Sequence, residues 1–116
     1  MLSRIRGFCQ LLSLIAGLAV IGTPLVAGEL PSLTRRAELL NLIRHDCGSC
    51  HGLTLAGGLG LPLLPEALKD KSPEALKETI LHGRGGTPMP PWRAFISEEE
   101  AGWIVDLLMK GLPDAR

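Results

Sequence analysis

The pattern of apolar and polar positions predicts a first helix early in the chain. Apolar side chains recur at helical spacing from Ser32 or Thr34 to Asp46, and the apolar face continues directly to Cys47. The residues that define this face are Leu40 and Ile43. The helix is therefore expected to deliver Cys47 at its carboxyl end.

Two later stretches carry explicit helix-start signals. Ser72-Pro73-Glu74 combines a cap, a proline at the first helical position and an early acid, and the helix it starts is expected to stop at Gly83. Residues 97–100 form a capping box before a last helix, which Gly111 and Pro113 end. The apolar residues of the two helices are Leu76, Ile80, Trp103, Ile104, Leu107 and Leu108.

The segments between the predicted helices are expected to be structured loops. Residues 52–65 are rich in Gly and Leu and contain two prolines, and residues 84–96 contain two Gly and three Pro. No strand pattern or internal repeat stands out. The sequence thus predicts an all-α domain of three main helices and structured loops.

The N-terminal region has the order of an export signal. Arg4 and Arg6 precede an apolar run at 11–21, Thr23-Pro24 interrupts the run, and small residues follow at 26–28. The run is short for a bilayer span, which needs about 20 residues, although a retained membrane anchor is the alternative interpretation.

The expected domain organisation follows from this signal. Residues 1–28 are interpreted as a secretory signal peptide and residues 29–116 as one domain located in the periplasm, with no stable membrane insertion after cleavage. Cys9 would be removed with the signal peptide. The mature chain would have 88 residues, with 10 Lys and Arg against 12 Asp and Glu, a formal charge of −2.

Composition limits the possible functions. The whole chain has a formal net charge of zero, which disfavours a nucleic-acid binder or a polybasic membrane binder. Aromatic residues make up only 3% of the chain, so a mature domain of this size would bury a thin core. Domains below roughly 70–80 residues usually need a staple, and this one is only slightly larger. A large apolar prosthetic group would serve as such a staple.

Cys47-Gly48-Ser49-Cys50-His51 is a C-x-x-C-H motif, the attachment pattern of c-type haem. Two thiols on one edge can add to the two vinyl groups of one haem, and His51 then falls under the iron. A thioredoxin-like redox pair would need strands, which the sequence lacks. A disulfide remains possible, as does a zinc site completed by His45 or His82.

The second axial iron ligand must come from elsewhere, and Met89 is the favoured candidate. It lies between Pro88 and Pro90-Pro91, which fix the backbone of a loop. A Met and His pair favours ferrous iron and raises the potential. The other potential donors are assigned to the core (Met109), a solvated helix end (His45) and the helix-terminal surface (His82).

The arrangement of these motifs resembles the class I cytochrome c family, and more closely its cytochrome c55X group. The segments that carry the resemblance are 46–54, 57–60, 64–68, 80–84 and 86–92. The resemblance implies a small class I fold around one covalent haem c, with Cys47 and Cys50 as thioether residues and His51 and Met89 as axial ligands.

The family often has a proline directly after the proximal-loop glycine, and the carbonyl of that proline accepts a hydrogen bond from the ligand histidine. Here Leu61 follows Gly60 and the proline is Pro62, which leaves the acceptor open.

The c55X group is associated with denitrification and the haem-d1 nitrite reductase. This resemblance implies a non-enzymatic electron carrier that takes electrons from a respiratory cytochrome or quinol-oxidising complex and passes them to nitrite reductase. The alternative is an accessory factor in maturation of that reductase. A ligand sensor or peroxidase is disfavoured, because no acid or base lies beside Met89 in the sequence. Arg84 and Arg93 flank the Met89 loop and are expected to form a basic docking patch.

Overall fold

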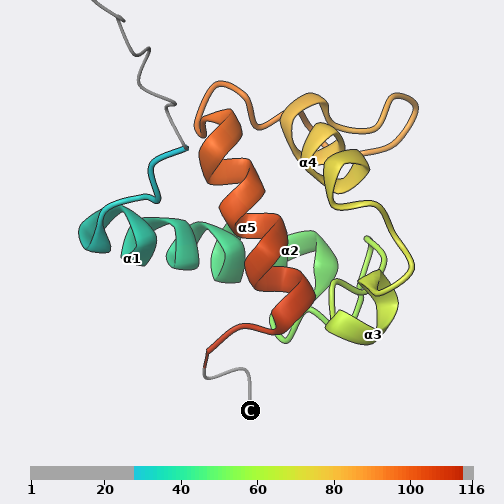
Figure 1. The fold of residues 1–116 in the computed structure, drawn as a ribbon. Helices are drawn as coiled ribbons and strands as arrows, with labels where there is room; N and C mark the ends of the chain where they lie inside the picture. Colours follow the sequence, from blue (N-terminus) through green and yellow to red (C-terminus); the bar gives the residue numbers. More distant parts are fainter. Residues whose placement is uncertain (1–27, 114–116) are drawn as a thin grey trace, which may run out of the picture.

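The computed structural model describes residues 28–113, and within this range every regular element is a helix. The elements are α1 (Leu33–Asn41), the π-helical turn η1 (Leu42–Cys47), α2 (Gly48–His51), α3 (Pro65–Leu68), α4 (Pro73–His82) and α5 (Glu98–Lys110) (Figure 1). The all-α prediction is therefore confirmed. The predicted signal peptide lies almost wholly outside the described residues, and no helix among those described is long and apolar enough to cross a membrane.

The first helix is longer than the sequence predicted. It begins at the cap Ser32, whose hydroxyl accepts from the Arg35 amide at 3.2 Å, and helical structure continues without a break through η1 and α2 to His51. The predicted end at Asp46 was wrong because nothing stops the helix before Gly52, which has φ +90°. Cys47 ends a π-helical turn, an uncommon element that often occurs at functional sites.

The starts of α4 and α5 follow the predicted signals. The Ser72 hydroxyl accepts from Ala75 N at 3.4 Å, and the helix ends at Gly83 with φ +70°. At α5 the capping box is complete, since Ser97 Oγ accepts from Glu100 N at 3.2 Å and the Glu100 carboxylate accepts from Ser97 N at 2.9 Å. The short helix α3 was not predicted, although Pro65 at its first turn is a helix-start signal.

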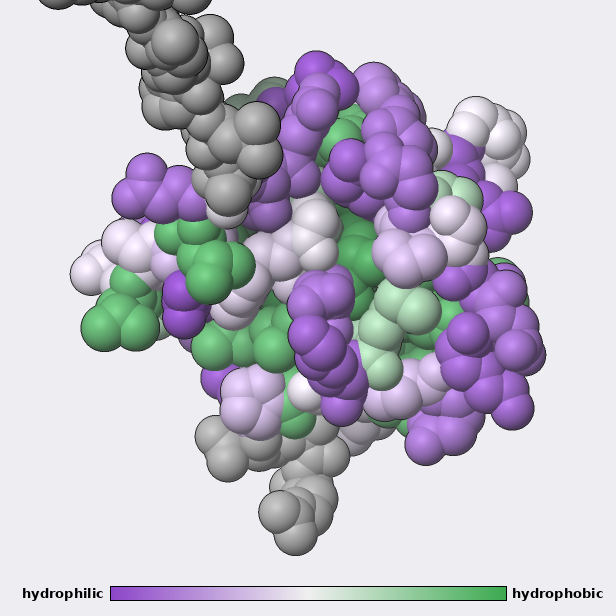
Figure 2. All heavy atoms as spheres, in the orientation of Figure 1, coloured by the Kyte–Doolittle hydropathy of each residue, from purple (hydrophilic) through white to green (hydrophobic). Residues whose placement is uncertain are grey.

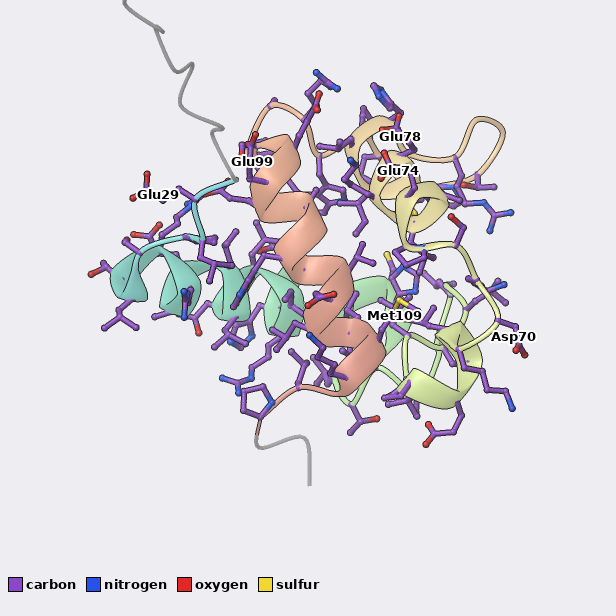
Figure 3. All side chains as sticks on the ribbon, in the orientation of Figure 1. Glu29, Asp70, Glu74, Glu78, Glu99 and Met109 are labelled. Carbon is purple, nitrogen blue, oxygen red and sulfur yellow. The ribbon has the colours of Figure 1, made fainter. Side chains whose placement is uncertain are left out.

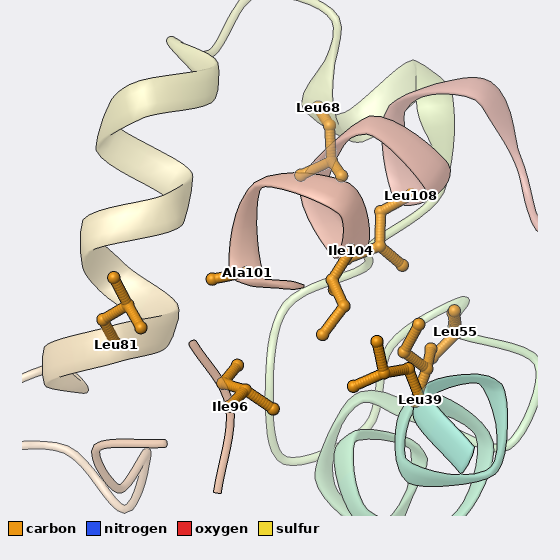
Figure 4. Close-up of a cluster of buried hydrophobic side chains, with 9 residues drawn as sticks. Leu39, Leu55, Leu68, Leu81, Ile96, Ala101, Ile104 and Leu108 are labelled. Carbon is orange, nitrogen blue, oxygen red and sulfur yellow. The ribbon is translucent and has the colours of Figure 1, made fainter. Parts of the chain in front are cut away.

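One apolar cluster joins these helices, and α5 lies at its centre. Ile104 and Leu108 of α5 pack with Leu39 and Leu55 at one end of the cluster, and Ala101 lies toward Leu81 at the other (Figure 4). In Figure 1, α5 passes in front of the carboxyl-terminal part of the first helical segment, near α2. The buried positions differ slightly from those predicted, because Leu39 and Leu81 are fully buried whereas Leu40 and Ile80 are only half-buried.

The core is thin, as the composition indicated. Figure 2 shows a strip of apolar surface between hydrophilic side chains on one face of the molecule. Large apolar side chains also remain exposed in the loop after α2, with Leu53 at 77%, Leu59 at 89% and Leu61 at 64%. Residues 52–65 contain no charged side chain, so this loop is held by backbone hydrogen bonds and packing.

Arg35 connects the first and last helices. Its Nε and Nη2 donate to the two carboxylate oxygens of Glu100 at 2.6 and 3.2 Å, and its Nη1 donates to Glu38 at 2.8 Å. Nη2 also donates to the Phe95 carbonyl at 2.9 Å. The pair with Arg35 lowers the pKa of Glu100. One guanidinium therefore holds α1, the capping box of α5 and the turn before it.

Replacing Arg35 with Ala is expected to lower the free energy of unfolding by about 1–2 kcal/mol at pH 7, because Glu100 loses a two-point partner. The pair stabilises the fold above the ordinary Glu pKa of about 4.3, and this contribution is lost as the pH falls through the lower pKa of folded Glu100. Urea denaturation of wild type and Arg35→Ala should thus converge toward pH 3. The control, Lys110→Ala, breaks an exposed pair with Asp106 and should cost under about 0.5 kcal/mol. An equal Arg35→Ala deficit at pH 7 and pH 3 would contradict the expectation.

Candidate haem site

The C-x-x-C-H motif lies on one continuous helical segment. Cys47 ends η1, and Cys50 and His51 form the last turn of α2. The two cysteines are three residues apart, so their side chains lie on neighbouring positions of one helix face. Both are free thiols and half-buried. Burial, aided by the nearby Asp46 carboxylate, raises the pKa of Cys47 to about 11, so this thiol keeps its proton at neutral pH.

The rival interpretations of the motif find no support in the structure. The cysteines are not joined in a disulfide. Among residues 28–113 no group of three or more His, Cys, Asp or Glu side chains is placed to hold a metal ion. His45 is exposed, and His82 is an exposed residue whose Nε2 lies 3.2 Å from Glu78 Oε2.

The loop after α2 folds back and closes the end of the helix. Gly57 N donates to the His51 carbonyl and Gly60 N donates to the Cys50 carbonyl, both at 2.8 Å. These bonds satisfy carbonyls that a helix end leaves without partners. The fold-back requires glycine at position 52, where a Cβ would lie 2.5 Å from the Gly57 carbonyl oxygen. The orientation of His51 is thus fixed by its own backbone and by the loop against it.

The His51 ring is oriented by the Leu61 carbonyl. Its Nδ1 lies 2.7 Å from Leu61 O, and since a carbonyl oxygen can only accept, Nδ1 carries the proton. Nε2 then keeps its lone pair, the form in which imidazole binds iron. The acceptor that the sequence left open is therefore Leu61, the position where the resembled family often has proline.

Gly60 was noted in the sequence as the glycine before Leu61, but its contact with the His51 ring was not predicted. A Cβ there would lie 2.6 Å from His51 Nδ1 and 2.7 Å from Cε1, so the ring packs directly on the Gly60 backbone. The Gly-x-Gly spacing at 58–60 was visible in the sequence. What it did not reveal is that the imidazole, 9 residues earlier in the chain, occupies the space of the missing side chain.

Met89 lies on a separate loop at the end of α4. Arg84 N donates to the Met89 carbonyl at 3.2 Å, and Met89 N donates to Thr87 Oγ1 at 3.4 Å. Gly83 lies against the same loop, where a Cβ would meet Met89 O at 2.7 Å. The Met89 side chain is half-buried. Met109, the other methionine within the described residues, packs against the core cluster from α5, as Figure 3 shows near its carboxyl end.

The two arginines beside this loop differ in their surroundings. Arg84 is exposed in the loop, whereas Arg93 Nη2 donates to Glu98 Oε1 at 2.9 Å. The predicted basic patch of Arg84 and Arg93 therefore needs correction, because a carboxylate offsets the charge of Arg93. Arg84 is the residue that still offers a cation to a partner.

A cavity of about 330 Å³ lies between α4 and α5, but it is not suited to haem. Carboxylates of both helices line it, with Lys77 paired to Glu74 at 2.7 Å. The lining contains no residue of the C-x-x-C-H motif or of the Met89 loop. The residues that line it are Pro73, Glu74, Lys77, Glu98, Glu99, Gly102, Val105 and Asp106.

The donor set fits a covalently bound haem. Two free thiols on one helix face and an imidazole with an available Nε2 lie in one short segment, in a domain whose apolar core is thin. When bound, a c-type haem supplies an iron that exchanges one electron. The all-helical fold and this site together define a small c-type cytochrome.

Comparisons with known proteins support the assignment to the c-type cytochromes. The family model described as "Cytochrome C oxidase, cbb3-type, subunit III" matches residues 33–108. The chain is 54% identical over 88 residues to Cytochrome c55X of Pseudomonas aeruginosa, covering 76% of this chain and 74% of that protein. It is 48% identical over 100 residues to Cytochrome c55X of Paracoccus denitrificans, covering 86% and 90%. The chain belongs to the cytochrome c55X group of c-type cytochromes, whose cofactor is one covalent haem c.

Solved structures support the same assignment. A structure titled "c-type cytochrome NirC" superposes with a TM-score of 0.69 at 54% identity, covering 71% of this chain and 96% of that one. Another, titled "Dihydro-heme d1 dehydrogenase NirN in complex with DHE", gives a TM-score of 0.58 at 36% identity, covering 64% of this chain but only 16% of that one. This chain therefore corresponds to a small part of the dehydrogenase.

Replacing Gly60 with Ala should displace the His51 ring, because no space exists for the added Cβ. We expect a loss of about 2 kcal/mol or more in the free energy of unfolding of the haem-loaded protein, together with a smaller low-spin fraction. Thermal unfolding followed in the haem absorption band measures both. Gly85→Ala is the matched control, since nothing lies within 4 Å of a Cβ there. Equal stability of the two variants would show that the contact with His51 is unimportant.

Proposed function

We propose that this chain is a periplasmic electron carrier that delivers single electrons to the haem-d1 nitrite reductase of denitrification. Residues 1–28 act as the cleaved signal peptide, and the domain of residues 29–116 is the carrier. It takes its electrons from a respiratory cytochrome or a quinol-oxidising complex. Membership of the c55X group and the single C-x-x-C-H motif support this proposal.

The observation that carries the proposal is the His51 site. Cys47 and Cys50 attach the haem, and His51 serves as the proximal ligand. The contact of its Nδ1 with Leu61 O, which leaves the lone pair on Nε2, supports this role. Met89 completes the iron site from the proline-bounded loop. Iron held by both His51 and Met89 would have no open position for a substrate, which would favour outer-sphere electron transfer over catalysis.

Met89 is preferred to His82 as the distal ligand on the basis of their surroundings. Met89 is half-buried in a loop whose backbone is bonded at Arg84 and Thr87. His82 is 53% exposed and beside Glu78 at the end of α4. A ligand must be held toward the haem, whereas an exposed side chain paired along its own helix is turned to solvent.

Met89→Ala is expected to lower the redox potential, because a thioether ligand favours ferrous iron, and to open the iron to carbon monoxide. The weak far-red charge-transfer band of the oxidised protein should disappear at the same time. His82→Ala removes only an exposed pair and should change none of these properties. Optical redox titration and carbon monoxide difference spectra test both variants. Collapse of the low-spin spectrum in His82→Ala would reverse the ligand assignment.

A second function, in maturation of the haem-d1 enzyme, is favoured by one specific similarity. The Dihydro-heme d1 dehydrogenase of Pseudomonas aeruginosa is 35% identical to this chain over 104 residues, covering 90% of this chain and 20% of that protein. A dehydrogenation releases two electrons and two protons, and a monohaem protein accepts one electron. Two oxidised copies of this chain would therefore be reduced for each substrate oxidised by such an enzyme.

Stopped-flow mixing separates the two functions. Reduced protein mixed with oxidised nitrite reductase should be oxidised within the turnover time of the reductase if the carrier function is correct. Fast reduction of the oxidised protein by the dehydrogenase and its substrate, with no reaction toward the reductase, would favour the maturation function and contradict the carrier function.

Arg84→Glu should slow association with an acidic redox partner several-fold at low ionic strength, because charge acts mainly on the association rate. Arg93→Gln should have a smaller effect, since Glu98 already offsets that charge. The rate is measured by stopped flow across a range of salt concentrations. A rate unaffected by Arg84→Glu and flat with salt would exclude docking through this arginine.

A further inference from the structure

The strength of the hydrogen bond at His51 depends on where the Leu61 carbonyl points. That carbonyl lies 2.7 Å from His51 Nδ1. Its direction is set by the backbone torsion of Leu61, since the oxygen has no freedom of its own. Leu61 lies outside every helix, so no helical hydrogen-bond ladder fixes that torsion. Another constraint must therefore fix the backbone torsion of Leu61.

Pro62 supplies the constraint. The proline ring clashes with the preceding residue in the helical region and restricts it to extended conformations. The Pro62 ring is itself held, because it lies close to Gly57, where a Cβ would be 3.4 Å from Cγ and 3.5 Å from Cδ. Gly57 N in turn donates to the His51 carbonyl at 2.8 Å. The ring thus packs on the same backbone that fixes His51.

The far side of Pro62 is anchored as well. Leu63 N donates to the Leu55 carbonyl at 2.9 Å, and Leu55 is part of the buried core. Gly60 N, on the near side, donates to the Cys50 carbonyl at 2.8 Å. Residues 61 and 62 therefore lie between two fixed backbone points, and the remaining freedom at Leu61 is the freedom that a following proline removes.

We propose that Pro62 is a positioning residue that sets the electron-donating strength of His51, and through it the redox potential, by fixing the Leu61 carbonyl. A firm Nδ1–H···O bond makes the imidazole a more basic ligand, which stabilises ferric iron and lowers the potential. The inference rests on the proposed role of His51 as iron ligand and does not depend on which protein accepts the electron.

A proline one residue earlier would restrict residue 61 through its φ angle instead of its ψ angle. Within the described residues no backbone hydrogen bond uses the Leu61 N–H as donor, so a proline at 61 removes no bond seen there. Its ring would fix the φ angle of residue 61 directly. Moving the proline from 62 to 61 therefore offers a partial rescue, which reduces the backbone freedom of residue 61 without restoring the original side chain.

The test uses the haem-loaded protein and three variants. Pro62→Ala should raise the redox potential and accelerate solvent exchange of the His51 Nδ1 proton several-fold, measured by optical redox titration and by NMR. The double variant Leu61→Pro, Pro62→Ala should move both quantities back toward their wild-type values, because residue 61 again has a restricted backbone. Pro65→Ala is the matched control, because Pro65 begins α3 and its loss should change neither quantity.

The sign of the change in redox potential distinguishes a positioning role of Pro62 from a simple loosening of the loop. Loosening that admits water to the haem lowers the potential, because exposure favours the more charged ferric state. A lowered or unchanged potential in Pro62→Ala, or a double variant in which the His51 Nδ1 proton exchanges several-fold faster than in wild type, overturns the proposal. The double variant decides the question even if Pro62→Ala fails to bind haem.

The ligand itself is checked in the same NMR spectra. Ring resonances of His51 that are strongly shifted by ferric iron confirm it as the ligand. If they are shifted and Pro62→Ala changes nothing, the positioning role fails and the proposed function stands. If the His51 resonances are not shifted, His51 is not the ligand, and the positioning role and the proposed function fail together.

Discussion

Two backbone hydrogen bonds at the end of the first helix fix the proximal side of the site. The amides of Gly57 and Gly60 satisfy the carbonyls of His51 and Cys50, so the loop is closed onto the helix end that carries the imidazole. This closure uses several residues without side chains, among them Gly52 because of its positive φ and Gly60 because the His51 ring occupies the space. The Leu61 carbonyl can reach His51 Nδ1 only in a loop closed in this way.

The Met89 loop is fixed by a similar use of backbone bonds, and one helix connects it with the first helical segment. Trp92 N donates to the Ile80 carbonyl at 3.1 Å and Arg93 N to the Leu81 carbonyl at 3.2 Å, which ties the end of the Met89 loop to α4. α5 packs against α4 and also against the first helix through the common core. The Arg35 guanidinium adds a polar connection from α1 to the capping box of α5.

The sequence predicted the elements whose causes are local. The capping box at Ser97 and the stop at Gly83 depend on residues within one turn, and both were predicted. The extension of the first helix to His51 was missed because Gly48 and Ser49 have modest helix propensity, and the closing loop contributes from outside. The Arg35–Glu100 pair spans 65 residues, a separation at which no local pattern reports contact.

In the candidate site too, the sequence predicted the features with local causes and missed those that depend on distant contacts. Cys47, Cys50 and His51 were found because their chemistry requires a fixed local spacing, whereas the hydrogen-bond acceptor of His51 depends on how a loop folds back. The chain positions this loop with few buried side chains: between positions 52 and 63 only Leu55 is buried. A thin core cannot hold a ligand by packing alone, so glycines that permit close approach and prolines that remove backbone freedom take over that task. The glycines and prolines beside His51 and Met89 are thus the means by which a small domain limits the backbone freedom of both candidate ligands.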